Sequence, residues 1–195
     1  DRFMPSVEAS LKTIGVDQVD LLLIHWPSFG NEVPLEHYIE ALAEAQRLGH
    51  ARLIGVSNFT VALLNRTETL LGKGAIATNQ VEIHPYMQSR RLCAHAQRIG
   101  LQLTAYQPLA QGRVSKDAVL NAIAERHGVT ASAVSLAFLM ADGHIVIPAS
   151  SSEAHLRANF AASGVRLDAD EIAQIRTLER GLRVINPPKS PVWDD

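Results

Sequence analysis

The sequence contains a single cysteine, Cys93, so no disulfide can form within the chain. One thiol inside an apparently helical apolar pattern is typical of a core position in a protein of the reducing cytoplasm. Lysine and arginine number 18 against 20 acidic residues, and the formal net charge of -2 gives no field that would gather nucleic acid or an anionic membrane. We therefore expect a cytoplasmic protein with no nucleic-acid partner and no membrane partner.

Long apolar runs are also missing. No run approaches the roughly 20 residues that a membrane-spanning helix needs, and the first ten residues have neither the basic nor the apolar region of a secretory signal. Hydrophobic residues nevertheless make up 47% of the 195 positions, and no linker or low-complexity segment divides them. This composition predicts one folded domain over residues 1–195.

Short apolar runs alternate with longer stretches of helical spacing, which is the pattern of repeated βα units. Strands are expected at 19–24, 51–56, 76–81, 101–106 and 145–147. The expected helices are one through Val7, Leu11 and Ile14 that ends at Gly15, one from Pro34 to Leu48, one capped by Thr60, one ending at Gly100, and further ones over 115–127, 130–142 and 152–162. Asp168 and Glu171 have the spacing of a capping box that starts a last helix.

These strands have continuous rather than alternating apolar character, which predicts a parallel sheet covered by helices. No strand is followed by a Gly-x-Gly-x-x-Gly turn, so a doubly wound dinucleotide fold lacks its fingerprint, whereas a βα barrel requires only repetition. A complete barrel has eight strands and ~250 residues. We therefore expect an α/β protein, the C-terminal portion of a parallel (β/α)8 barrel, in a chain that begins in mid-fold.

In such barrels the active site lies at the carboxyl ends of the strands, so the polar residues after each apolar run are the candidates. Most of them carry amide or hydroxyl groups, without a cluster of carboxylates or thiols, which favours holding a polar ligand over metal-assisted hydrolysis. No metal site is expected. A redox cofactor would supply the chemistry that these side chains lack. The candidates are His25, Trp26, Ser57, Asn58, Asn79, Gln80, Tyr106, Gln107 and Ser150.

Three runs resemble successive signatures of the aldo-keto reductases: residues 23–27 (LIHWP), 49–59 (GHARLIGVSNF) and 79–86 (NQVEIHPY). The runs 106–109 and 147–148 follow in the order typical of that family, so the resemblance extends over essentially the whole chain. The ending 191–194 is similar to that of bacterial 2,5-diketo-gluconate reductases of the B type. The resemblance implies that the chain corresponds to barrel strands 4 to 8 with their helices, and that the domain is incomplete at its N-terminus.

The resemblance also implies hydride transfer from a nicotinamide to a carbonyl, with a tyrosine as proton donor and a histidine, a lysine and an aspartate around it. His25 matches the histidine, where a neutral imidazole polarises the substrate carbonyl. Taken without its motif, His25 would be read as a structural histidine. The other three members have no match here, so we expect the chain alone to be nearly inactive.

The cofactor positions carried over from the family are more numerous. Ser57, Asn58 and Gln80 match the residues that hold the nicotinamide carboxamide, and Tyr106 matches the aromatic on which the nicotinamide ring stacks. Further matched cofactor positions are Gln107, Leu109, Ser150 and the adenine-contacting Asn159. The family's lysine and arginine for the 2′-phosphate are replaced by Ala149 and His155, while Arg157 is nearby. NADPH is the expected cofactor, and NADH stays possible.

Trp26 and the loop 28–33 match the rim that holds the substrate. The function implied is NAD(P)H-dependent reduction of small polar aldehydes or ketones, such as diketo-gluconate or methylglyoxal, by an enzyme that is a monomer when complete. Two alternatives stay open: a catalytically inactive, cofactor-binding or regulatory module with a reductase-like fold, and a remnant without function of its own. Binding of NADPH without carbonyl reduction would favour the first of these, and failure to fold the second.

Overall fold

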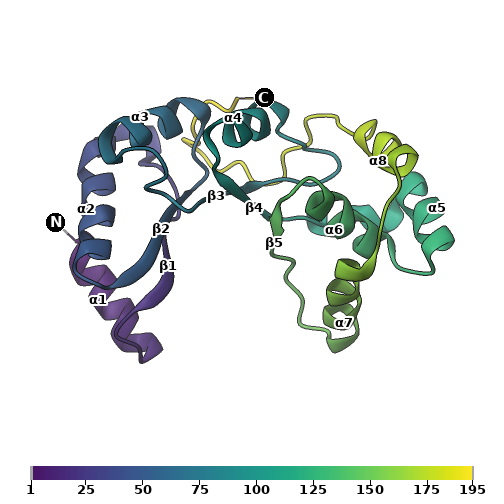
Figure 1. Cartoon of the computed structure of the whole chain (residues 1–195), viewed down its shortest axis with the longest axis horizontal. Coiled ribbons are helices and arrows are strands. Elements are labelled where there is room, and N and C mark those ends of the chain that lie inside the picture. The colour runs from purple at the N-terminus through teal and green to yellow at the C-terminus, as the bar shows by residue number, and fades with distance from the viewer. Residues whose placement is uncertain (1, 195) are drawn as a thin grey trace. The chain divides into compact units, whose positions relative to one another are not determined.

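The computed structural model describes residues 2–194 (Figure 1). Its strands are β1 (Val19–Ile24), β2 (Ala51–Ser57), β3 (Thr78–Glu82), β4 (Gln102–Tyr106) and β5 (Ile145–Val146). The α-helices are α1 (Phe3–Ile14), α2 (Leu35–Arg47), α3 (Val61–Leu71), α4 (Arg90–Ile99), α5 (Ala118–His127), α6 (Ala131–Ala141), α7 (Glu153–Ala161) and α8 (Ala169–Arg176). Short 3₁₀ segments add η1 (Phe29–Asn31), η2 (Ala110–Lys116) and η3 (Ala162–Gly164).

The strands are hydrogen-bonded in chain order, β1-β2-β3-β4-β5, and the pairs β1/β2, β2/β3 and β4/β5 are parallel. Each of the first four strands is followed by a helix before the next strand begins. The prediction of a parallel sheet built from βα units is therefore confirmed. Since neighbouring parallel strands end at the same edge, the residues after β1 and β2 lie near each other in the first unit.

Several helix boundaries follow the predicted signals. Gly15 ends α1 in the left-handed conformation, with φ of 80°, and the Thr60 side chain accepts a hydrogen bond from the Leu63 N–H at the start of α3. Asp168 and Glu171 form the predicted capping box of α8. Serine, threonine and aspartate caps act through local geometry, so they can be identified without knowing the tertiary structure.

Other boundaries differ from the expectation. Strand β3 begins at Thr78 rather than residue 76, and it ends at Glu82 rather than residue 81, because a glutamate does not extend an apolar run. Helix α5 begins at Ala118 rather than residue 115, because the Asp117 carboxylate caps it by accepting the N–H groups of Val119 and Leu120. Strand β5 ends at Val146 rather than residue 147.

Packing divides the chain into two compact units, one formed by residues 2–80, 94–102 and 187–194, the other by 81–93 and 103–186. In the first unit, α1 and α2 flank β1 and β2 (Figure 1), and Leu35, Ile39 and Leu42 of α2 are fully buried. Helical spacing in the sequence places Ile14 and Leu48 with the apolar residues of α1 and α2, but their exposed fractions are 63% and 50%. Both lie at the last turn of a helix, beyond the packed stripe.

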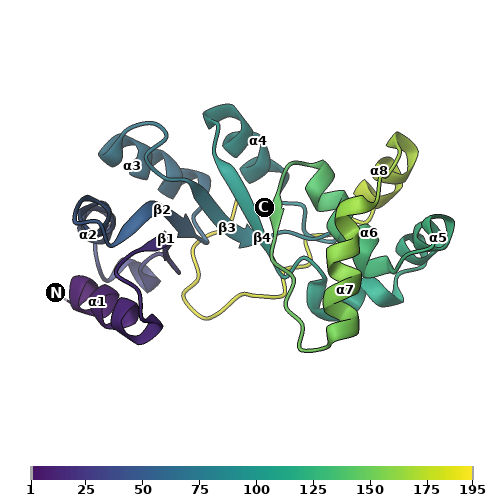
Figure 2. The same ribbon diagram turned by 60° about the horizontal axis from the view of Figure 1, so that its bottom comes forward.

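The core of the second unit surrounds α6. Eight of its eleven residues are buried, and Ala133 and Leu136 pack with Ala162 from η3. Helix α7 lies alongside α6, and α8 lies beside α5 (Figure 2). Within residues 2–194, no helix combines the length and the apolar character needed to cross a bilayer.

Candidate functional site

In the first unit, hydrogen bonds join the residues at the carboxyl ends of β1, β2 and β3. The Asn58 side-chain amide donates to the backbone carbonyl of His25 at 2.9 Å and to the Ser57 hydroxyl at 3.1 Å. The Ser57 hydroxyl donates in turn to the backbone carbonyl of Gln80 at 2.7 Å. The predicted residues His25, Ser57, Asn58 and Gln80 therefore come together on one hydrogen-bonded edge.

Asn58 has a backbone conformation that few residues adopt. Its φ is 62°, in the left-handed region that asparagine tolerates better than most non-glycine residues. Its backbone N–H donates to Gln80 O at 2.9 Å, and the side chain is buried, with 2% exposed. The turn after β2 thus depends on the identity of this residue.

An aromatic cluster lies beside His25. The Trp26 ring is stacked near Phe29, with centroids 5.7 Å apart, and Trp193 meets Trp26 edge-on at 6.0 Å. The His25 ring lies 6.4 Å from Trp26 and its residue is exposed, so the imidazole is accessible. The predicted rim residue Trp26 is therefore one side of an aromatic wall that includes Phe29 and Trp193.

Trp193 was not predicted as a site residue. Its segment approaches the rim because Lys189 Nζ pairs with Glu32 Oε1 at 2.7 Å. The Asp194 carboxylate also accepts the Val61 N–H at 2.8 Å. Both contacts join residues more than 130 positions apart, so no local pattern could reveal them.

In the second unit, Tyr106 lies at the end of β4 and lines a pocket of about 470 Å³. Burial raises the pKa of Tyr106 well above its usual value, the Glu82 carboxylate raises it further, and the Arg183 guanidinium opposes both. The phenol therefore stays protonated at neutral pH, and Tyr106 is better suited to contact a ligand with its ring than to donate a proton. The other lining residues are Gln107, Pro108, Leu109, Gln111, Gly112, Ile147, Pro148 and Ala149.

A second pocket of about 350 Å³ shares Leu109, Gly112 and Ala149 with the first. Hydroxyl, amide and imidazole groups dominate its polar lining, with no lysine or arginine among the lining residues. Arg157 is exposed and pairs with Glu153 Oε1 at 2.6 Å. The remaining lining residues are Ser115, Thr130, Ser132, Ser150, His155, Ala158 and Asn159. The predicted positions Leu109, Ser150 and Asn159 thus line one cavity.

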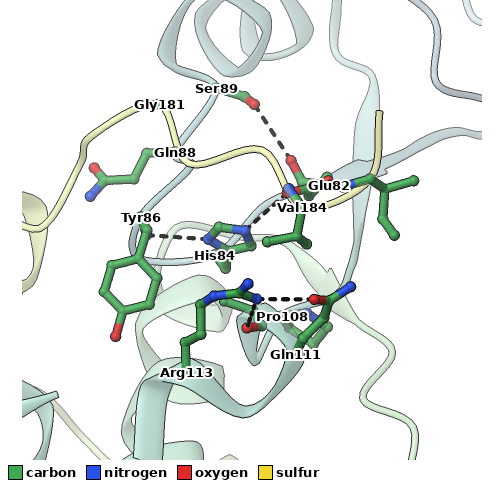
Figure 3. Close-up of polar contacts among 12 residues, drawn as sticks. Glu82, His84, Tyr86, Gln88, Ser89, Pro108, Gln111, Arg113, Gly181 and Val184 are labelled. Atoms are coloured by element: carbon green, nitrogen blue, oxygen red, sulfur yellow. Dashed lines mark hydrogen bonds and ion pairs between the residues drawn. The ribbon is translucent and has the colours of Figure 1, made fainter. Parts of the chain in front are cut away.

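Two ionisable residues at the end of β3 were not predicted as site residues. Glu82 and His84 are fully buried, with exposed fractions of 1% and 0%, and lie 3.1 Å apart (Figure 3). A signal was present in the sequence, because a glutamate and a histidine two residues apart in an otherwise apolar run indicate a satisfied buried pair.

The single cysteine shows no sign of reactivity. Cys93 is half-buried, and burial raises the pKa of its thiol to about 12. The described residues contain no group of three or more histidine, cysteine, aspartate or glutamate side chains arranged for a metal ion.

The fold and these pockets define a class of protein: a parallel βα protein with ligand-sized, partly polar pockets beside the carboxyl ends of its strands. The aldo/keto reductase family profile matches residues 1–180. Methylglyoxal reductase DkgB of Escherichia coli O157:H7 is 40% identical over 195 residues, covering 100% of this chain and 73% of the relative. The chain therefore belongs to the aldo/keto reductase family.

Solved structures agree with this assignment. A protein described as a 2,5-diketo-D-gluconic acid reductase B superimposes with a TM-score of 0.94 at 40% identity, covering 99% of this chain and 69% of that one. A single-residue mutant of Gox0644, solved in complex with NADPH, superimposes with a TM-score of 0.87 at 32% identity, covering 92% of this chain and 66% of that one. The fold is a partial (β/α) barrel of an oxidoreductase family whose members reduce carbonyl groups.

Proposed function

We propose that the chain forms strands 4 to 8 of the barrel of an NAD(P)H-dependent reductase acting on small polar aldehydes and ketones. The observation that carries this proposal is the hydrogen-bonded set Ser57, Asn58 and Gln80 at the carboxyl ends of β2 and β3. The similarity to a methylglyoxal reductase and to a diketo-gluconic acid reductase supports a small polar carbonyl substrate.

The donors and acceptors of this chain suit a nicotinamide dinucleotide, which would supply the hydride when bound. In the first unit, the amide and hydroxyl groups of Ser57, Asn58 and Gln80 match a carboxamide, which both donates and accepts hydrogen bonds. In the second unit, the protonated Tyr106 ring opens onto a pocket large enough for a stacked heterocycle. Gln107 and Leu109 line the same pocket and would close around the ribose and phosphate.

The second pocket would hold the adenosine end, with Asn159 toward the adenine and Ser150 toward a phosphate. Hydroxyl groups donate hydrogen bonds to a phosphate, but they supply no charge to balance a 2′-phosphate dianion. His155 is the single titratable side chain in this lining. NADPH is the cofactor we propose, because the similar Gox0644 mutant is solved in complex with NADPH. We propose that NADH is accepted as well, because this lining offers no lysine or arginine to favour a 2′-phosphate.

His25 and Trp26 are proposed to act on the substrate. An exposed neutral imidazole can donate a hydrogen bond to a carbonyl oxygen and stabilise the charge that develops there during hydride transfer. The wall of Trp26, Phe29 and Trp193 would exclude water and limit the size of the carbonyl compound. Such a wall favours compact substrates over bulky ones.

The chain's own tyrosines do not suit the role of proton donor. Tyr38 packs edge-on against Phe59, and burial raises its pKa. The Tyr86 hydroxyl lies 3.1 Å from Asp117 Oδ2 and the residue is 1% exposed, while Tyr106 is assigned to stacking. We therefore propose that the general acid comes from outside residues 1–195. Loss of a general acid costs roughly 10²- to 10⁴-fold in rate.

The test is to titrate the chain with NADPH while following the fluorescence of Trp26 and Trp193, then to assay methylglyoxal reduction beside DkgB. We expect saturable NADPH binding and a turnover rate roughly 10²- to 10⁴-fold below that of DkgB. Binding with no turnover at all would favour the inactive cofactor-binding module. A folded chain that binds neither NADPH nor NADH would contradict the proposal.

A further inference from the structure

The Glu82 carboxylate accepts hydrogen bonds from the chain's C-terminal part. Oε1 accepts the Val184 N–H at 2.6 Å (Figure 3). Oε2 accepts the Ile185 N–H at 2.8 Å. These donors lie more than 100 residues away along the sequence. A buried carboxylate is costly unless hydrogen bonds replace its water shell, so both bonds are needed to keep Glu82 where it is.

His84 completes the shell of this carboxylate. Its Nδ1 accepts the Tyr86 backbone N–H at 3.3 Å, which leaves the ring proton on Nε2. Nε2 then donates to Glu82 Oε1 at 3.1 Å. The imidazole thus acts as a neutral donor that orients the carboxylate toward Val184 and Ile185.

Residues 179–185, which we call the strap, are fastened to the segment 82–88 along their length. The Leu182 N–H donates to Tyr86 O at 2.9 Å, and the Arg180 guanidinium stacks over the Tyr86 ring, 4.2 Å from its centroid. Glu179 accepts the Gln88 N–H. Beyond Leu182, the strap is held by Glu82, which accepts the N–H groups of Val184 and Ile185.

The end of the strap lies close to Tyr106. Glu82 is the last residue of β3 and Tyr106 the last of β4, and these two strands are neighbours in the sheet. Arg183 lies between the two fastened residues Leu182 and Val184, and its guanidinium and the Glu82 carboxylate both act electrostatically on the Tyr106 phenol. A displaced strap would therefore change the surroundings of the Tyr106 ring.

We propose that Glu82 is a positioning residue for cofactor binding: by holding Val184 and Ile185, it fixes the strap beside Tyr106 and keeps that ring in place for the nicotinamide. This inference rests on the proposed function, because Tyr106 matters here as the stacking surface. The adenosine pocket contains neither Glu82 nor a strap residue, so it should not depend on Glu82.

The test compares two ligands on two variants. Glu82→Gln keeps the shape but replaces one acceptor oxygen by an amide NH₂, which faces a backbone N–H. We expect it to weaken NADPH binding about tenfold, the size of one aromatic contact, and to leave adenosine 2′,5′-bisphosphate binding unchanged. The matched control is Glu171→Gln. The Glu171 carboxylate is also buried, with 4% exposed, and it too forms hydrogen bonds with a histidine ring and a backbone N–H. It should change neither affinity.

Each outcome bears on the proposal. Equal weakening of both ligands by Glu82→Gln, or no change for either while the wild-type chain binds both, would overturn the positioning role. If Glu82→Gln does not fold, Glu82→Asp replaces it. Aspartate keeps the charge but is too short to reach both N–H groups. We then expect NADPH affinity to fall less than tenfold and the affinity for adenosine 2′,5′-bisphosphate to stay unchanged. Failure of the wild-type chain to bind NADPH would contradict the proposed function itself.

Discussion

The Asp194 carboxylate accepts a hydrogen bond from the Val61 N–H at 2.8 Å, so the end of the described chain caps the first turn of α3. Thr60 already caps this helix by accepting the Leu63 N–H. The second cap satisfies another of the N–H groups that a helix start leaves without a partner, and its negative charge suits the positive end of the helix. It also holds the neighbouring Trp193 against Trp26.

Replacing Asp194 by alanine should therefore affect both stability and the aromatic rim. We expect a loss of about 1 kcal/mol in the free energy of unfolding, which is typical of a helix cap. Trp26 and Trp193 are the two tryptophans, so the emission spectrum should shift as the rim loosens. Urea unfolding followed by tryptophan fluorescence measures both effects. Asp194→Asn keeps an acceptor oxygen and should lose less; equal losses would argue against the capping bond.

The left-handed turn at Asn58 gives a second prediction. Asn58→Ala places an unfavourable residue at φ of 62° and removes the bonds to His25 and Ser57. We expect a destabilisation of about 2–3 kcal/mol, of which the backbone conformation accounts for roughly 1–2. Asn58→Gly removes the same side chain without the backbone cost, so it should be milder. A glycine variant as unstable as the alanine variant would show that the turn is not strained.

The stacking role that we propose for the Tyr106 ring can be separated from any role of its hydroxyl. Tyr106→Phe keeps the ring and should leave NADPH affinity within a factor of about three, whereas Tyr106→Ala should weaken it about tenfold. Isothermal titration calorimetry measures both. A phenylalanine variant as weak as the alanine variant would assign the role to the hydroxyl instead.

Because of Glu171, we expect the free energy of unfolding to fall in acid. Burial raises the pKa of its carboxyl, but hydrogen bonds from His127, the Asp168 N–H and Arg126 outweigh burial and lower that pKa below its ordinary value of 4.5. A carboxyl with a lowered folded pKa stabilises the protein above the unfolded pKa, and this contribution is lost as the pH falls through the folded pKa.

The measurement is the urea midpoint between about pH 6 and pH 3. Wild-type stability should fall across this range by more than that of Glu171→Gln, which has no carboxyl to protonate. Asp170→Asn, a change at the exposed neighbouring position, should keep the wild-type slope. Parallel curves for all three proteins would refute the assignment.

Most of the fold was predictable from the sequence, because caps and apolar runs act over short distances. Thr60, Gly15 and the Asp168/Glu171 box marked helix ends that the structure confirms. Strand β3 was predicted at 76–81, which starts two residues early and ends one residue before the polar Glu82. A criterion based on apolar runs therefore missed Glu82, although it included Gln80.

The candidate site was partly predictable for a similar reason. His25, Ser57, Asn58 and Gln80 lie at the ends of apolar runs, so their position at one edge of the first unit follows from parallel topology. Trp193, Asp194 and the strap reach their partners through contacts spanning about 100 residues or more, which no local pattern encodes. The pairing of Glu82 with Val184 and Ile185 belongs to this second kind.

Leu109, Gly112 and Ala149 line both pockets of the second unit, so they form a common wall. Two of these three residues, Gly112 and Ala149, have very small side chains, so a larger side chain at either position would change the wall that the two pockets share. In the proposed assignment, where the two pockets hold the two ends of a dinucleotide, selection on one end would therefore act on the other as well. A lineage that changed its coenzyme preference through residue 149 would then have to adjust the proposed nicotinamide pocket in the same step.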